Sequence, residues 1–331
     1  MNPETSHLYK QAGQFAKANT LRSYTEIVFT LAIYFTLLYV LFFAYTHNLW
    51  LLYIPICLIA GFIMVKIFTL LHDCTHHSLF NTPRQNHVVG VFLSLFITMP
   101  FTSWKAEHDD HHSHVVDIDR MKHGDVTLYT VEQFKNLPWY KQLGYTIFRH
   151  PVFLLVAAPF LYFFVKSRIP SIWTKPVILS VVWTNIAVAI IYLPLVWYFG
   201  FWTTVFVFVP AAYIGGIIGV ALFYLQHDYP GVEWFKTDAW EHSHASLAGS
   251  SLIILPQPLE WFSHAIGYHH IHHLNSKVPG YRLRECYDAV PDFQTVKPLT
   301  WSDVVQAFKL KLWSHEKNML VNFSEAKKLN S

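Results

Sequence analysis

The chain has 331 residues, of which 53% are hydrophobic and 17% aromatic, while only 14% carry a charge. Soluble globular proteins contain about 25% charged residues, so this composition is typical of an integral membrane protein. The formal net charge of +3 is too small to indicate binding to nucleic acid. There are 21 histidines against 24 lysines and arginines, an unusual balance that points to a function based on imidazole groups.

Four apolar segments are long enough to cross a membrane as helices, because each contains roughly 20 residues with almost no charge. They cover residues 27–45, 49–71, 176–197 and 201–225. Only a few residues separate the first segment from the second and the third from the fourth. The sequence therefore predicts an all-α integral membrane fold with four transmembrane helices arranged as two hairpins.

Two shorter apolar segments, 87–103 and 151–165, are marginal for spanning a membrane. If 87–103 crossed once, the histidine clusters before and after it would lie on opposite sides and would not share a site. We therefore predict that 87–103 is re-entrant, interfacial or packed inside the protein, and the same reasoning applies to 151–165.

Lysine and arginine gather between the two hairpins and are absent from both hairpin tips. By the positive-inside rule, the face that carries the histidines is predicted to be cytoplasmic, where a helical cap would hold them.

The predicted organisation has three parts: a cytoplasmic segment over residues 1–26, a membrane domain over 27–290 and a cytoplasmic amphipathic segment over 291–331. In the last part, apolar residues recur at helical spacing from Trp301 to Trp313. This pattern predicts an amphipathic helix, which either lies on the membrane surface or packs on the cytoplasmic domain.

Three histidine clusters follow or flank the apolar segments. They are His72 and His76; His108, His111 and His112; and His269, His272 and His273. On a helix, positions i, i+3 and i+4 share one face, and several neutral imidazoles that converge on one point bind a metal ion. Eight imidazoles exceed the four ligands of a zinc site, so the clusters predict two metal ions.

Further candidates lie next to these ligands. His227 ends the last apolar segment on the same side as the clusters, and we predict it to be a ninth ligand. His77 lies off the helical face of the first cluster and is left open as a ligand. Metal-bound imidazoles usually donate their second N–H group to a carboxylate or carbonyl. The candidate partners are Asp73, Asp109, Asp110 and Asp228.

The residue types restrict the metal and its chemistry. Few carboxylates accompany the histidines, which argues against calcium and magnesium, whereas imidazole-rich sites suit iron, copper, nickel or zinc. Of these metals, iron commonly supports oxygen activation beside a hydrophobic substrate. A metal transporter is a second reading, but its ligands would lie near the middle of the membrane in broken helices.

The clusters resemble the three histidine boxes of the integral-membrane fatty acid desaturases. The matching patterns are His72-x-x-x-His76-His77, His108-x-x-His111-His112 and His269-x-x-His272-His273. The stretches 272–283, 224–227 and 249–251 resemble the bacterial and plastid acyl-lipid branch, and the resemblance covers roughly residues 49–290. The same boxes occur in lipid or carotenoid hydroxylases and ketolases, which stay open as alternatives.

The resemblance implies a non-haem di-iron site that uses O2 and two electrons to remove two hydrogens from neighbouring methylenes of an acyl chain. It implies no catalytic side chain beyond the metal ligands, a membrane acyl lipid as substrate and a bacterial inner membrane as location. The chain has no flavin, haem or iron–sulfur motif, so ferredoxin or cytochrome b5 would deliver the electrons. A basic surface that includes Lys105, Lys122 and Lys141 is predicted to dock an acidic donor such as ferredoxin.

Overall fold

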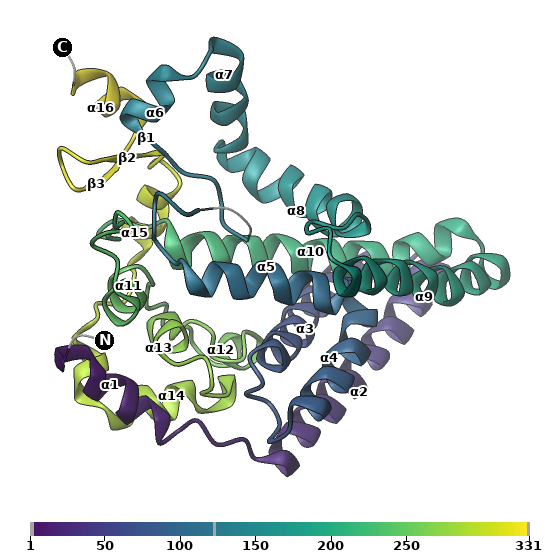
Figure 1. Ribbon diagram of the computed structural model, residues 1–331. Helices are drawn as coiled ribbons and strands as arrows, with labels where there is room; N and C mark the ends of the chain where they lie inside the picture. The colour runs from purple at the N-terminus through teal and green to yellow at the C-terminus, as the bar shows by residue number, and fades with distance from the viewer. Residues whose placement is uncertain (1–2, 122–123, 330–331) are drawn as a thin grey trace.

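The structure is a computed structural model that describes residues 3–121 and 124–329, and it is largely helical (Figure 1). Four of the described helices are long and apolar enough to cross a membrane. They are α2 (Thr20–Thr46), α3 (Trp50–Thr75), α9 (Lys175–Phe199) and α10 (Phe201–His227). The four predicted spans and their pairing in two hairpins are thus confirmed.

Helix α2 extends beyond its predicted apolar segment at its N-terminal end, and α3 and α10 extend beyond theirs at their C-terminal ends. The side chain of Asn19 accepts a hydrogen bond from the backbone N–H of Arg22 and caps α2. At their C-terminal ends, α3 continues through His72 and α10 continues through His227. The last turns of two membrane-crossing helices therefore carry histidines.

Helix α3 is the central helix and packs against α2, α4 (Pro83–Ile97) and α10. Two glycines permit the close approach of α3 and α10. A Cβ atom added at Gly61 would lie 2.4 Å from the Cγ2 of Ile214, and one added at Gly215 would lie 2.7 Å from the Cβ of Met64. Small residues at such a crossing allow van der Waals packing of two helices inside a membrane.

Both shorter apolar segments are bent. Helix α4 meets α5 (Phe101–Ser113) at 104°, with Thr98 between them at a φ of 56°. Helix α7 (Trp139–Phe148) meets the segment Phe153–Arg168 at 66°. That segment comprises η1 (Phe153–Ala157), α8 (Ala158–Phe160), η2 (Leu161–Val165) and η3 (Lys166–Arg168). By length and composition each bent pair is a broken span or a re-entrant loop, so the predicted re-entrant path stays a prediction.

Shorter helices gather at the left of Figure 1, at the end of the spans opposite the α9–α10 turn, and both chain ends lie there. They are α1 (Pro3–Gly13), α6 (Val131–Asn136), α11 (His242–Ala248), α12 (Leu259–Phe262), α13 (His269–Leu274), α14 (Gly280–Ala289), η4 (Pro291–Thr295), α15 (Trp301–Ala307) and α16 (Phe323–Lys328). Together with the ends of the spans they surround the histidines.

The C-terminal segment corrects one prediction. Helix α15 ends at Ala307, and β2 (Leu312–Ser314) pairs in parallel with β1 (Tyr129–Thr130) and antiparallel with β3 (Met319–Val321). The predicted amphipathic helix is therefore wrong in its second half. Leu312 and Trp313 are fully buried in the sheet region, because backbone pairing with the distant β1 and with the neighbouring β3 outweighs the local helical period.

Candidate metal centre

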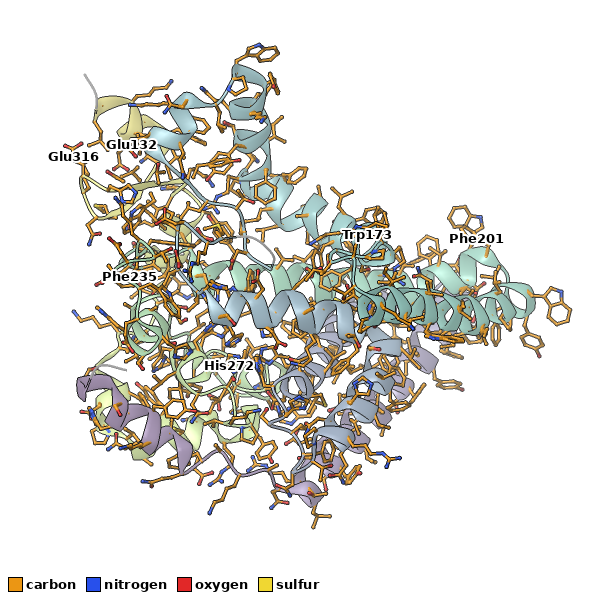
Figure 2. The ribbon with its side chains drawn as sticks, viewed as in Figure 1. Glu132, Trp173, Phe201, Phe235, His272 and Glu316 are labelled. Atoms are coloured by element: carbon orange, nitrogen blue, oxygen red, sulfur yellow. The ribbon has the colours of Figure 1, made fainter. Side chains whose placement is uncertain are left out.

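The nine histidines predicted as ligands converge in two groups. The first consists of His72, His76, His108, His112 and His272, and the second of His111, His227, His269 and His273. In each group, one nitrogen atom from every imidazole lies within 4.8 Å of the others. Figure 2 labels His272, which lies in the middle of the molecule where the ends of the spans meet the cap.

Helix geometry explains the division. Helix α5 directs His108 and His112 to the first group and His111 to the second, while α13 directs His272 to the first and His269 and His273 to the second. Helices α5 and α13 thus serve both groups. By contrast, the ligand candidates at the end of α3 serve only the first group, and α10 serves only the second. The shared helical face predicted from the spacing is wide enough to point at two neighbouring centres.

The nitrogen atoms have the spacing of neighbouring metal ligands. The Nε2 atoms of His76 and His108 are 2.9 Å apart, and those of His112 and His272 are 3.1 Å apart. Two ligands at right angles on a metal ion, each about 2.1 Å from it as in zinc–imidazole bonds, would lie about 3.0 Å from one another. These two pairs of imidazoles therefore have the spacing of neighbouring ligands on one cation.

The tautomers of two imidazoles in the second group strengthen this conclusion. His111 Nδ1 lies 2.5 Å from the Asp125 carboxylate, and His227 Nδ1 lies 3.0 Å from the carbonyl oxygen of Gly249. Both partners are acceptors, so in the neutral rings each Nδ1 carries the proton and each Nε2 carries a lone pair. The two Nε2 atoms nevertheless face each other at 3.1 Å. Two facing lone pairs form no hydrogen bond, and a shared cation satisfies both.

The protonation of the cap histidines agrees with metal binding. Burial, reinforced by the neighbouring imidazoles, lowers the pKa of His269, His272 and His273 well below the usual range. These rings are therefore neutral near pH 7, and a neutral imidazole has the lone pair that a metal ion requires. Eight of the nine histidines are buried, and His112 is partly exposed.

The structure changes the predicted set of aspartate partners. Asp73 accepts a hydrogen bond from the backbone N–H of Gly280, and its other oxygen lies 3.6 Å from His72 Nδ1. The three remaining aspartates contact other groups: Asp109 accepts from Lys105 at 2.6 Å, Asp110 lies 3.5 Å from His114, and Asp228 accepts from Arg149 at 2.8 Å. Asp109 and Asp228 thus each pair with a cation in the structure, and their role as partners of metal-bound imidazoles stays a prediction.

Sequence reasoning missed two partners of the ligand candidates, the carboxylate of Asp125 and the carbonyl of Gly249. Asp125 lies 14 residues after His111, a separation too long for contact within a single helix or strand. No local signal marks it, since the chain must leave α5 and return before the two side chains meet.

Two further predictions concern residues that belong to neither histidine group. His77, left open as a ligand, starts the loop after α3 at a φ of 55° and belongs to neither group of the described residues. Of the three lysines predicted to dock an electron donor, Lys141 is exposed, Lys105 pairs with Asp109, and Lys122 lies outside the described residues.

Comparison with known proteins agrees with this geometry. The sequence model of the family described as "Fatty acid desaturase" matches residues 48–303, a range that contains all three histidine clusters and His227. The chain belongs to the fatty acid desaturase family. The resemblance inferred from the histidine boxes is thus confirmed, and the protein is an oxidoreductase that desaturates fatty acyl chains.

Curated relatives of this desaturase carry consistent names. A protein of Bacillus subtilis (strain 168) named "Fatty acid desaturase" is 28% identical over 97% of this chain and 91% of its own length. An "sn-1 oleoyl-lipid 12-desaturase" of Picosynechococcus sp. is 26% identical, covering 73% of this chain and 70% of that protein. An "sn-1 acyl-lipid omega-3 desaturase (ferredoxin)" of Synechocystis sp. is 25% identical, covering 73% and 68%.

An apolar cavity of about 30 Å³ lies between α3, α10 and η2 of the desaturase, toward the middle of the spans. Its lining includes Phe68, one turn before His72, and Gly219, two turns before His227. A Cβ atom added at Gly219 would meet no other heavy atom within 4 Å. A small apolar cavity therefore lies one helical turn from His72 and two turns from His227, on the side of the spans.

Proposed function

We propose that this desaturase introduces a double bond into an acyl chain of a membrane lipid at a non-haem di-iron centre, using O2 and two electrons from a separate protein. The observation that carries the proposal is the pair of imidazole groups with converging Nε2 atoms, to which the ends of two membrane-crossing helices, α3 and α10, contribute. The five-histidine group would hold one iron and the four-histidine group the other.

The donor set supports iron. Neither group contains a carboxylate or a thiolate among the described residues, and imidazole-rich sites suit iron whereas thiolate-rich sites select zinc or iron–sulfur clusters. When bound, the iron pair would supply the oxygen activation needed to break an unactivated C–H bond, for which acid, base and nucleophilic side chains are too weak.

The residues of the chain hold the ligands and keep the site apolar. The Trp104 ring stacks on His108 with ring centroids 4.5 Å apart, and Phe223 packs against both His111 and His227. These aromatic side chains fix the imidazole planes and exclude water from the membrane side. An acyl chain that enters from the bilayer would approach the histidines through apolar surroundings while its head group stays at the interface.

The names of two relatives support the substrate and the electron donor. They specify acyl groups of lipids, and one of them names ferredoxin. We extend both features to this chain: an acyl lipid as substrate and a ferredoxin as donor, with cytochrome b5 as the other donor to be tested.

We also propose that the histidine groups face the cytoplasm, in a bacterial inner membrane. Lysine and arginine are absent from both hairpin tips and frequent between the hairpins. Single cysteines at Asn48 and Tyr198 should react with an impermeant thiol reagent added outside intact cells, whereas one at Trp301 should react only after permeabilisation. The three native cysteines are buried and should give little background. Labelling of Tyr198 and Trp301 from the same side would contradict this orientation.

The reaction itself is tested in a host that lacks polyunsaturated lipids. One acyl chain, O2, two electrons and two protons should yield one alkene and two water molecules, so new double bonds should appear in lipid acyl chains only with oxygen present. Mass spectrometry of the lipids after growth under 18O2 should find no label in the product. A labelled hydroxyl or keto group would instead identify a hydroxylase or ketolase, and an alkene formed without oxygen would also refute the proposal.

A further inference from the structure

A lysine is buried inside α3, six positions before His72. The Lys66 side chain is only 1% exposed, and its Nζ lies 2.9 Å from the carboxylate of Glu26 on α2 and 4.8 Å from the ring centroid of Trp261. Burial of an ion pair costs desolvation energy that its attraction often fails to recover. Ionisable residues inside membrane-crossing helices therefore tend to have a functional role.

A continuous polar path connects this lysine to the first metal-binding group. The Nζ of Lys66 lies 2.7 Å from Nδ1 of His264, and Nε2 of His264 lies 3.2 Å from Asp73. Asp73 also accepts the backbone N–H of Gly280 at 2.7 Å, and its second oxygen lies 3.6 Å from Nδ1 of His72. In the described part of the protein, this buried Nδ1 has no hydrogen-bond partner.

The donors and acceptors of Lys66, His264 and Asp73 determine the direction of each hydrogen bond along this path. An ammonium group has donors only, so Nδ1 of His264 must accept from Lys66. Burial, with the Lys66 charge as a further cause, lowers the pKa of His264, which is consistent with a neutral ring. A neutral imidazole with an accepting Nδ1 carries its proton on Nε2, and this nitrogen lies 3.2 Å from a carboxylate oxygen of Asp73. The Asp73 carboxylate is thereby held as an acceptor beside His72.

We propose that Lys66 is a positioning residue for one of the two irons: through His264 and Asp73 it fixes the His72 proton on Nδ1, so that the lone pair on Nε2 is presented to the metal. This role rests on the proposed di-iron centre, since His72 is a ligand only there. The present 3.6 Å separation exceeds a hydrogen bond, and metal binding at Nε2 should draw the ring to within about 3.0 Å of Asp73.

Three variants separate the donor function of Lys66 from its charge. Lys66→Met removes the donor and leaves Glu26 without a counter-charge. The double variant Lys66→Met with Glu26→Gln removes the donor and both charges. Glu26→Gln alone keeps the donor to His264 and serves as the matched control. His264→Phe, which keeps a ring at this position, interrupts the same path at its second member and provides an independent test if Lys66→Met fails to fold.

The measurement is the release of iron from the purified, iron-loaded full chain to a chelator, with Mössbauer spectra that distinguish the two irons. Loss of a residue that orients a metal ligand typically weakens a site about 10–100-fold. We expect release from one iron site to accelerate by that factor in Lys66→Met, in the double variant and in His264→Phe. The other site should be unchanged, and Glu26→Gln should stay within about twofold of the wild type.

The possible failures are distinct. Wild-type release rates in the double variant and in His264→Phe would refute the positioning role and leave the di-iron centre intact. Equal acceleration at both sites would also refute it, because a general loss of structure would then be the cause. A wild-type protein that binds no iron would overturn the metal centre and the positioning role together.

Discussion

Replacement of His272 by alanine is expected to abolish desaturation and to empty one of the two metal-binding groups, whereas His270→Ala should retain both metals. His272 directs its Nε2 into the first group, 3.1 Å from that of His112. Changes to residues that only support a ligand cost about 10–100-fold in affinity or activity, so loss of a ligand should cost at least about 100-fold. His270, two positions earlier, belongs to neither group and lies near Phe293 and Tyr287.

The two variants form a matched pair because both remove a fully buried imidazole from the same short helix. Iron per chain, acyl-chain products and the thermal midpoint should be measured for each. His270→Ala should lower the midpoint, since it opens a cavity in the core, while iron content stays near the wild-type value. Equal loss of iron in both variants, with both still folded, would contradict the assignment of the helical faces.

Arg149→Met is expected to be strongly destabilising, by about 3–5 kcal/mol, because it would leave a buried carboxylate without its counter-charge. The Arg149 side chain is fully buried and donates to Asp228 at 2.8 Å and to the hydroxyl of Tyr224 at 3.3 Å. The Arg149 carbonyl accepts from the ammonium group of Lys311. Arg149 thus contacts the C-terminal segment through its carbonyl and the end of α10, beside His227, through its side chain.

The thermal midpoint of the purified protein would measure this effect. A suitable control is Arg282→Met, which breaks an i, i+3 pair with the exposed Glu285 and should cost less than about 1 kcal/mol. Arg149→Met combined with Asp228→Asn should recover part of the loss, since the uncompensated charge is then removed. A single Arg149→Met variant as stable as Arg282→Met would show that the buried pair with Asp228 contributes little to stability.

The sequence by itself determined the features that depend on neighbouring positions along the chain. The lengths of the apolar segments predict the four apolar helices, because about 20 apolar residues are needed to cross a bilayer as a helix. The spacing within each cluster predicts which histidines point together, since side-chain direction on a helix repeats every 3.6 residues.

Tertiary structure decided which of these directions meet. The division of the nine histidines into five and four depends on how α3, α5, α10 and α13 pack, and no local period encodes a distance between helices. Tertiary structure likewise brings Asp125 to His111 from a loop. Leu312 fits the helical spacing of the sequence but lies in strand β2, where it pairs with Val321. In the sequence, Lys66 is a single charged residue within an apolar segment. It acquires a role only because packing brings Glu26 and His264 to its ammonium group.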